Sequence, residues 1–471
     1  MTIEYVFLML VVYDEHGPIA NRLRRIFLNA RPHGGIRDPR LDGLHPTFGD
    51  NRNENSAMTA GNSISQIVQT QCCIAGGGPA GMVLGFLLAR AGVEVLVLEK
   101  HKDFLRDFRG DTIHPSTLEL MCELGILDDF LRRPHQELRQ IGARIEDFEV
   151  TVADFSHLPT HCKFVGLMPQ WDFLNFIAEK AKDYPQFHLR MESEVTDLIL
   201  ENGRVVGVSA KTPNGTLEVR ADLTVGADGR HSIVREKAGF QVIDLGAPID
   251  VLWMRVSRLP SDPPQTLGRF RAGKFLVTID RSDYWQCAYV IAKGEFAAIQ
   301  QKGLPAFRED IESLAPFFRG RTAELKDWND IKLLSVAVDR LRNWSRAGLL
   351  CIGDSAHAMS PIGGVGINLA IQDAVAAANI LWQPLLNGAP SEDELRKVQK
   401  RREFPMRMIQ GFQLFAHKRL IGPALSFKGR LERLPLPMRL LQQFPVLRRI
   451  PARFIGMGPR PEHVHTPDTR G

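Results

Sequence analysis

The sequence predicts an α/β protein in which one domain, built on a parallel sheet, is interrupted by an antiparallel sheet and followed by C-terminal helices. From Ile67 onward, short apolar runs alternate with helical patterns, which is typical of parallel α/β sheets. Residues 240–300 instead carry β-rich runs separated by Pro, Gly and Asp. The alternating pattern returns after Leu349, so the first domain is expected to be assembled from two separate stretches of chain.

This alternation divides the chain into five expected regions. Residues 1–66 are expected to be a poorly ordered extension, because irregular Gly, Pro, Arg and Asn follow a short apolar run. An alternative is that the working protein begins at Met58. The other four regions are the parallel-sheet domain in two parts (67–245 and 346–390), a mainly β inserted domain (246–345) and a C-terminal helical region (391–471).

Composition excludes several classes of protein. The 471 residues are 44% hydrophobic and 24% charged, which is ordinary for a globular protein. The net charge of +5 is not accompanied by basic residues interleaved with aromatics, so no nucleic-acid partner is expected. The six cysteines form no CxxC pair or metal-ligand spacing, which favours a reducing cytoplasm and no metal. No run approaches the roughly 20 apolar residues of a transmembrane helix.

Two features outside the motifs allow more than one interpretation. Arginines between Arg430 and Arg453 alternate with apolar residues such as Phe444, so weak contact with a membrane surface is an alternative to the favoured solvated face. Cys72 and Cys73 adjoin in an apolar run. We expect them to be small core side chains of a buried strand.

The first chemical motif is Gly76-Gly77-Gly78-Pro79-Ala80-Gly81, placed after the expected strand Thr70–Ala75 and before the expected helix Met82–Ala91. In such a motif one glycine permits the tight turn, one lets the backbone approach a pyrophosphate and one allows close packing of the helix on the strand. The helix start offers free N–H groups to the anion. A second strand, Val93–Leu98, ends at Glu99, which can accept hydrogen bonds from a ribose diol.

Two further segments end apolar strands with an acid beside glycine. Val225-Gly226-Ala227-Asp228-Gly229 is the first, and alone it is equally well explained as a plain turn. The second runs from the expected strand Leu349–Ile352 through Gly353-Asp354 and His357 to a glycine loop, residues 361–368, before the expected helix Leu369–Leu381. Asp354 is placed to bind a polyol. The loop brings backbone amides to a helix start, which suits the edge of a reduced, anionic flavin ring.

In this order and spacing, the three segments resemble the FAD fingerprint, the Asp-Gly motif and the Gly-Asp motif of class A flavoprotein monooxygenases, the aromatic hydroxylases similar to para-hydroxybenzoate hydroxylase. The resemblance covers residues 70 to about 385. It implies a Rossmann-like FAD-binding domain of the GR2 type with an inserted antiparallel substrate domain. The chain shows neither the WxWxIP segment of flavin halogenases nor an added thioredoxin-like domain, and the first absence speaks against halogenation.

The resemblance also implies roles for individual residues. Arg109 matches an arginine that reaches the FAD phosphates or the flavin, Gln170 a glutamine that contacts the cofactor, and Val195 the backbone beside adenine. Asp228 is implied in contacts to FAD and NAD(P)H. The implied cofactor-binding set is Gly76, Gly78, Pro79, Ala80, Gly81, Glu99, Lys100, Arg109, Gln170, Val195, Asp228, Gly353, Asp354, Pro361, Gly364, Gly366, Ile367 and Asn368. No catalytic side chain is assigned; Pro361 and His357 are the flavin-proximal candidates, and a structural role is favoured for His357.

The implied reaction is oxygen transfer to an aromatic or similar small organic substrate through a flavin C4a-hydroperoxide, with NADPH or NADH as transient co-substrate and O2 as oxidant. Only one dinucleotide fingerprint is present, so NAD(P)H is expected to bind in a groove. Candidate substrate-lining residues, for which ordinary sheet packing is the favoured alternative, are Trp253, Arg255, Arg269, Tyr284 and Trp285. The rival functions are a reductase of the geranylgeranyl reductase kind and a flavin-binding protein without turnover.

Overall fold

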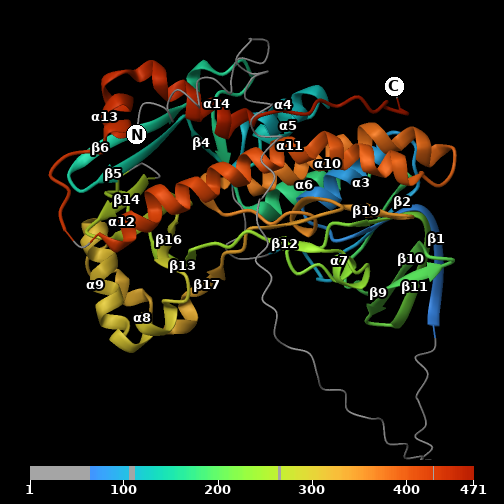
Figure 1. Ribbon diagram of the computed structural model, residues 1–471, viewed down its shortest axis with the longest axis horizontal. Helices are drawn as coiled ribbons and strands as arrows, with labels where there is room; N and C mark the ends of the chain where they lie inside the picture. The colour runs from blue at the N-terminus through green and yellow to red at the C-terminus, as the bar shows by residue number, and fades with distance from the viewer. Residues whose placement is uncertain (1–63, 106–111, 264–266, 428, 471) are drawn as a thin grey trace, which may run out of the picture. The chain divides into compact units, whose positions relative to one another are not determined.

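The computed structural model describes residues 64–105, 112–263, 267–427 and 429–470 (Figure 1). Residues 1–63 of the expected N-terminal extension lie outside the described residues, and so does Arg109, the predicted contact to the FAD phosphates or the flavin. The described chain contains a first sheet with parallel central strands, a second, mainly antiparallel sheet, and helices that cover both.

The first sheet begins with the predicted βαβ unit: β1 (Ile64–Ala75), α3 (Pro79–Arg90) and β2 (Val95–Leu98). Its strands run in the order β19-β20-β11-β1-β2-β8, and β2, β1, β11 and β20 are parallel. A hairpin of β9 and β10 extends β11 antiparallel. The bounds of these strands are β8 Phe187–Arg190, β9 Glu194–Glu201, β10 Arg204–Thr212, β11 Gly215–Gly226, β19 Ser345–Arg346 and β20 Leu349–Cys351.

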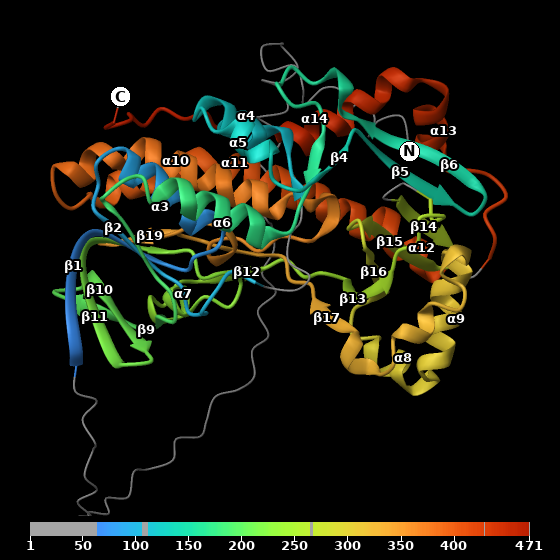
Figure 2. The same cartoon turned by 180° about the vertical axis from the view of Figure 1, so that it is seen from behind.

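The central strands are apolar because both of their faces are covered. Cys72 and Cys73 in β1 are fully buried, which confirms their prediction as core side chains. Helices α3, α6 (Gln170–Ala181), α10 (Gly366–Leu386) and α11 (Glu392–Ala416) lie side by side along one face of the sheet (Figures 1 and 2). Here α3 packs against both α6 and α10, and α10 packs against α11.

One helical segment among the described residues, Ile362–Leu386, is long and apolar enough to cross a membrane by length and composition alone. However, 72% of its most apolar window is buried inside the protein. Its neighbours are α3 and α11, so the apolar surface of α10 is explained by packing in the core of the first domain.

The second sheet has the order β17-β13-β16-β15-β14-β5-β6. The three predicted strands are present as β13 (Ile249–Ser257), β15 (Lys274–Asp280) and β16 (Tyr284–Ala292), and they pair antiparallel as expected. Its other strands are β5 Gln140–Ile145, β6 Phe148–Asp154, β14 Leu267–Arg271 and β17 Lys332–Ser335. The hairpin β5–β6 belongs by sequence to the expected region 67–245, yet β5 pairs with β14 and covers what would otherwise be an exposed strand edge.

Helices α8 (Phe296–Lys302) and α9 (Leu304–Leu314) follow β16 in the chain. The side chains of Phe307 and Ile311 on α9 pack into the apolar core on one face of this sheet. Trp285 and Arg269, expected as substrate-lining candidates, point into this core: Trp285 is fully buried, and the Arg269 guanidinium lies 4.9 Å from the Phe317 ring centre. Ordinary packing, the favoured alternative, therefore describes these two residues.

The opposite face of the second sheet meets the C-terminal part of the chain. Val251 and Val290 form an apolar cluster there with Ile362, Ile421 and Leu425. After α11 come a π-helical turn, η7 (His417–Ile421), and α12 (Gly422–Ser426), α13 (Leu436–Gln443) and α14 (Arg449–Met457). The remaining α-helices and β-strands of the described residues are β3 Thr112–Ile113, α4 Pro115–Glu123, α5 Leu127–Leu131, β4 Gln136–Leu138, β7 Val165–Leu167, α7 Ile233–Lys237, β12 Val242–Asp244 and β18 Asp339–Leu341.

Candidate cofactor site

The register of the first sheet brings all three motifs to one edge. Ala75, the last residue of β1, pairs with Leu98 on one side and with Gly226 on the other. Gly226 in turn pairs with Cys351. Neighbouring strands lie about 4.8 Å apart, so the loops that follow these residues leave the sheet side by side. This is the carboxyl edge of a parallel sheet, where open α/β sheets bind ligands.

In the first loop, Gly76 and Gly81 leave no room for a side chain. Gly76 has φ 107°, and a Cβ there would lie 2.4 Å from the carbonyl oxygen of Ala227. A Cβ on Gly81 would lie 2.0 Å from the carbonyl oxygen of Gly76. At Gly78, by contrast, a Cβ would meet no atom within 4 Å. The open space therefore lies in front of the start of α3, whose N-terminal cap uses no side chain.

Glu99 holds this loop and the one that follows β2. Its Oε2 accepts a hydrogen bond from the Gly77 N–H at 2.9 Å, and its Oε1 accepts one from the His101 N–H at 3.1 Å. The side chain is half-buried, whereas the neighbouring Lys100 is exposed. Contact of either residue with a cofactor ribose stays a prediction.

Asp228 has one carboxylate oxygen that no other described residue hydrogen-bonds. Its Oδ2 accepts a hydrogen bond from the Val234 N–H at 3.2 Å, while Oδ1 is buried and has no hydrogen-bond partner among the described residues. Burial raises the pKa of Asp228 above its usual range, although several hydrogen bonds oppose the shift. A buried acceptor at the sheet edge is a group that a bound polyol or amide would satisfy.

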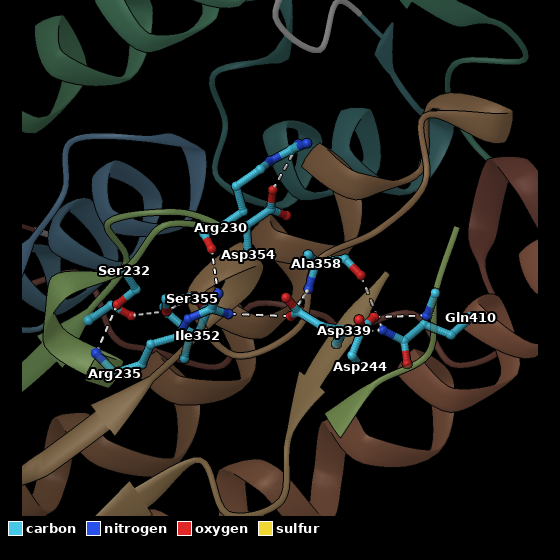
Figure 3. Close-up of polar contacts among 12 residues, drawn as sticks. Arg230, Ser232, Arg235, Asp244, Asp339, Ile352, Asp354, Ser355, Ala358 and Gln410 are labelled. Carbon is cyan, nitrogen blue, oxygen red and sulfur yellow. Dashed lines mark hydrogen bonds and ion pairs between the residues drawn. The ribbon is translucent and has the colours of Figure 1, made fainter. Parts of the chain in front are cut away.

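The third motif packs directly onto the first. Gly353 has φ 61°, and a Cβ there would lie 3.3 Å from the Cβ of Ala80. Asp354 is 31% exposed in its side chain and faces the Arg230 guanidinium at 3.4 Å (Figure 3). Arg230 was not predicted from the sequence, although a cation directly after the Asp-Gly turn is the signal that marks it.

His357 lies in the core behind the Gly-Asp loop, with 1% of its surface exposed. Its Nε2 is 2.6 Å from Oδ2 of Asp373, an acceptor that also receives the Gly353 N–H at 3.1 Å. The other oxygen of Asp373 accepts from Nε of Arg402 at 2.9 Å. The geometry favours the structural interpretation of His357 over the catalytic one, because the ring is used to support the loop.

The glycine loop after Pro361 is held by Thr112 and Asn368. Gly363 and Gly364 have φ of 78° and 62°, and a Cβ on Gly364 would lie 2.4 Å from Oγ1 of Thr112. The buried Asn368 amide accepts from the His114 N–H and donates to the Thr112 carbonyl, at 2.9 and 3.0 Å. Its side chain is thus committed to the protein. The start of α10 at Gly366 has no side-chain cap, so its backbone N–H groups are what a ligand would meet.

A polar network connects the Asp-Gly segment to the Gly-Asp loop and to α11 (Figure 3). Arg235 Nη1 lies 3.3 Å from Oδ1 of Asp339, which also accepts the Ala358 N–H at 3.3 Å. Gln410 donates to the carbonyl oxygens of Asp339 and Ala358, at 2.8 and 3.2 Å. The second and third motifs are therefore held in one arrangement by buried hydrogen bonds.

The other predicted residues lie on surrounding elements. Gln170 is the first residue of α6, and Val195 is a buried residue of β9 whose backbone pairs with Ala210. Trp253, on the face of the second sheet toward Ile362, packs in the apolar cluster with Val251. The Arg255 guanidinium lies 4.7 Å from the Tyr284 ring centre. Contact of these residues with cofactor or substrate stays a prediction.

The residue types at the sheet edge fit FAD. An open glycine approach at the start of α3 suits a pyrophosphate, and the uncapped start of α10 suits the electron-rich edge of a flavin ring. Hydroxyl groups are suited by Asp354, whose side chain is 31% exposed, and by Oδ1 of Asp228, which has no partner among the described residues. The fold and this edge define an FAD-binding flavoprotein.

Comparison with known proteins gives the same answer. Residues 69–411 match the family model described as FAD binding domain, and the chain belongs to that family. It is 36% identical over 340 residues to 6-methylpretetramide 4-monooxygenase of Streptomyces rimosus. The matched region covers 71% of this chain and 80% of that protein. The chain is an FAD-dependent oxidoreductase of the class A flavin monooxygenases, as the motifs predicted.

Solved structures of other proteins share the fold, and two of them illustrate the similarity to this chain. One is OxyS anhydrotetracycline hydroxylase from Streptomyces rimosus, with a TM-score of 0.65 and 23% identity, covering 83% of this chain and 76% of that chain. The other is the myxobacterial chondrochloren halogenase CndH, with a TM-score of 0.65 and 20% identity, covering 81% of this chain and 90% of that chain. At such identities these two structures establish the fold alone.

Proposed function

We propose that this enzyme uses NADPH or NADH and O2 to hydroxylate an aromatic small molecule, and that the substrate has fused rings. The observation that carries the proposal is the register of Leu98, Ala75, Gly226 and Cys351, which sets three FAD motifs along one sheet edge. The substrate class is supported by the name of one similar protein, a 6-methylpretetramide 4-monooxygenase.

When bound, FAD supplies hydride acceptance and O2 activation, so the protein has to supply placement and a water-poor site. The start of α3 would hold the pyrophosphate, and Asp354 the ribityl region. The loop Pro361–Asn368 would present backbone N–H groups to the flavin ring. Ile362 in this loop shares an apolar cluster with Val251 and Val290, so the loop packs against the second sheet.

The test is a panel of mono-, bi- and tetracyclic phenols offered to the FAD-loaded protein with NADPH and then NADH. The proposal expects some fused-ring compound to accelerate NAD(P)H oxidation, and the product to carry one oxygen atom from isotopically labelled O2. Acceleration that persists without O2 would instead support the reductase. Halogenation is distinguished by repeating the assay with and without chloride and bromide.

A cytoplasmic location and a solvated basic C-terminal face are part of the same proposal. The exposed side chains of Phe444 and Val446, 49% and 57% accessible, stand beside the arginines noted in the sequence. The expected outcome is that the purified protein does not co-sediment with phosphatidylserine vesicles at physiological salt. Co-sedimentation that is lost at high salt would favour the membrane-surface alternative.

A further inference from the structure

A row of three buried polar side chains on α11 and the turn that follows it holds the flavin loop from behind. Gln410 and Gln413 lie on α11, and His417 begins the π-helical turn η7. Their spacing of three and four residues puts them on one helix face. None of the three has any exposed surface. We call them the α11 seam.

Gln413 uses its whole amide on the loop. Its Oε1 accepts the Ser360 N–H at 3.1 Å, and its Nε2 donates to the carbonyl oxygens of Ser360 and Ile362, at 2.9 and 3.1 Å. This pattern fixes the orientation of the amide. In the flipped orientation the NH2 group would face the Ser360 N–H, and the amide oxygen would face two carbonyl oxygens. Gln410 continues the row with its bond to the Ala358 carbonyl.

His417 completes the row at Ser360. Its Nε2 lies 2.9 Å from Oγ of Ser360, which also accepts the Ile362 N–H at 3.3 Å. Burial lowers the pKa of His417, so the ring is uncharged at neutral pH. The other ring nitrogen, Nδ1, is buried without a hydrogen-bond partner among the described residues. Among the described residues, the hydrogen bond between Nε2 and Ser360 is therefore the polar contact that this ring makes.

The loop that the seam grips has few bonds of its own. Among the described backbone–backbone hydrogen bonds, one joins two residues of the segment Ala358–Gly364: the Gly364 N–H donates to the Pro361 carbonyl. Two consecutive glycines with positive φ follow, at Gly363 and Gly364. Such a segment gains its order from outside, because glycine loses more conformational freedom on folding than other residues.

We propose that Gln413 and His417 are positioning residues that set the height of the loop Pro361–Gly364 against the flavin ring, and thereby the ring's electronic environment. They act through the backbone and do not contact the cofactor. This inference rests on the proposed placement of the flavin ring at that loop. Because the FAD phosphates would be held elsewhere, at the start of α3, loss of the seam is expected to disturb the ring without releasing FAD.

The test uses the full chain loaded with FAD. Gln413→Met keeps side-chain length and removes three hydrogen bonds; His417→Phe removes the bond to Ser360, and His417→Gln can restore it. The matched control is Gln399→Met. Gln399 also lies on α11, where its side chain accepts a hydrogen bond from the Trp344 N–H and donates one to the Arg342 carbonyl, outside the loop. Two readouts are followed: amide hydrogen exchange of residues 358–366 and the visible absorbance and midpoint potential of bound FAD.

Loss of paired buried backbone groups is expected to raise exchange in the loop by about tenfold in Gln413→Met. The flavin bands and midpoint potential should shift in Gln413→Met and His417→Phe, return toward wild type in His417→Gln, and stay unchanged in Gln399→Met. FAD content should remain stoichiometric throughout. If Gln413→Met does not fold, the inference is tested by comparing His417→Phe with His417→Gln.

The inference is overturned if both readouts match wild type in the folded variants, if the loop exchanges faster while the flavin spectrum is unchanged, or if Gln399→Met produces the same shifts. Failure of the proposed hydroxylation looks different. In that case no compound of the panel is hydroxylated by wild type, whereas the spectroscopic effects of the seam variants are still observed.

Discussion

Replacing Asp373 with asparagine is expected to cost about 3–5 kcal/mol of folding free energy. Asp373 is fully buried on α10 and accepts hydrogen bonds from His357, Gly353 and Arg402. Burial alone would oppose ionisation, yet the neighbouring His357 and Arg402 hold the pKa of Asp373 below its usual range. The carboxylate is therefore charged, and each of its oxygens is occupied.

The magnitude follows from the donors that asparagine would leave without acceptors. Its amide has one acceptor oxygen in place of two, and its NH2 group must face either Arg402 or the His357 and Gly353 donors. Arg402 would keep only its bonds to Glu462 and the Arg460 carbonyl. Removing one partner of a buried ion pair typically costs the stated amount, which lowers the melting temperature of a protein of this size by roughly 3–6 °C.

The assay is thermal unfolding followed by fluorescence, with and without saturating FAD. The control is Asp393→Asn, because Asp393 is 85% exposed on α11 and its ion pair with Arg396 should contribute within about 0.5 kcal/mol. A melting temperature for Asp373→Asn within 1 °C of wild type, measured to about that accuracy, would refute the reasoning. An equal fall in Asp393→Asn would show that the effect does not come from burial.

Three further predictions concern FAD retention and the stability of the fold. Gly76→Ala should abolish FAD retention on gel filtration, since its Cβ would lie 2.4 Å from a carbonyl oxygen at a φ of 107°; full retention would contradict the assigned turn. Gly411→Ala, on α11 with no atom within 4 Å of the new Cβ, should raise stability by about 0.5–1 kcal/mol in urea unfolding, and a decrease would show an unseen constraint. Burial lowers the pKa of His114 from 6.5 to about 4, so only the unfolded chain takes up a proton in that range and stability falls as pH drops through it. In His114→Gln, the loss of unfolding free energy between pH 7.5 and pH 5 should be smaller by about 2 kcal/mol, and an unchanged loss would show that His114 is not the group.

The motifs could be predicted because each depends on residue type at a fixed local spacing. Only glycine tolerates a φ of 107° and the 2.4 Å approach at position 76, so the sequence itself shows the turn. The strands β13, β15 and β16 were visible for a similar local reason, their β-branched and aromatic content between turn residues. The cofactor class followed from these local signals, and the family match confirms it.

The hairpin β5–β6 shows where local signals end. Its own pairing is local, but its place at the edge of the second sheet depends on the bonds of β5 to β14, more than a hundred residues further along the chain. The contact of Arg230 with Asp354 spans 124 residues, and that of Gln413 with Ser360 spans 53. No periodicity or spacing encodes such contacts.

The sequence by itself thus determined the strand-loop-helix units, their glycines and acids, and through them the FAD-binding class. Only the tertiary structure decided which side chains support those loops: His357 and Asp373 behind the Gly-Asp turn, and the α11 seam behind the flavin loop. The physical reason is that a turn is specified by the steric limits of its own residues. A buried hydrogen bond between distant segments exists only when packing has removed water from both partners.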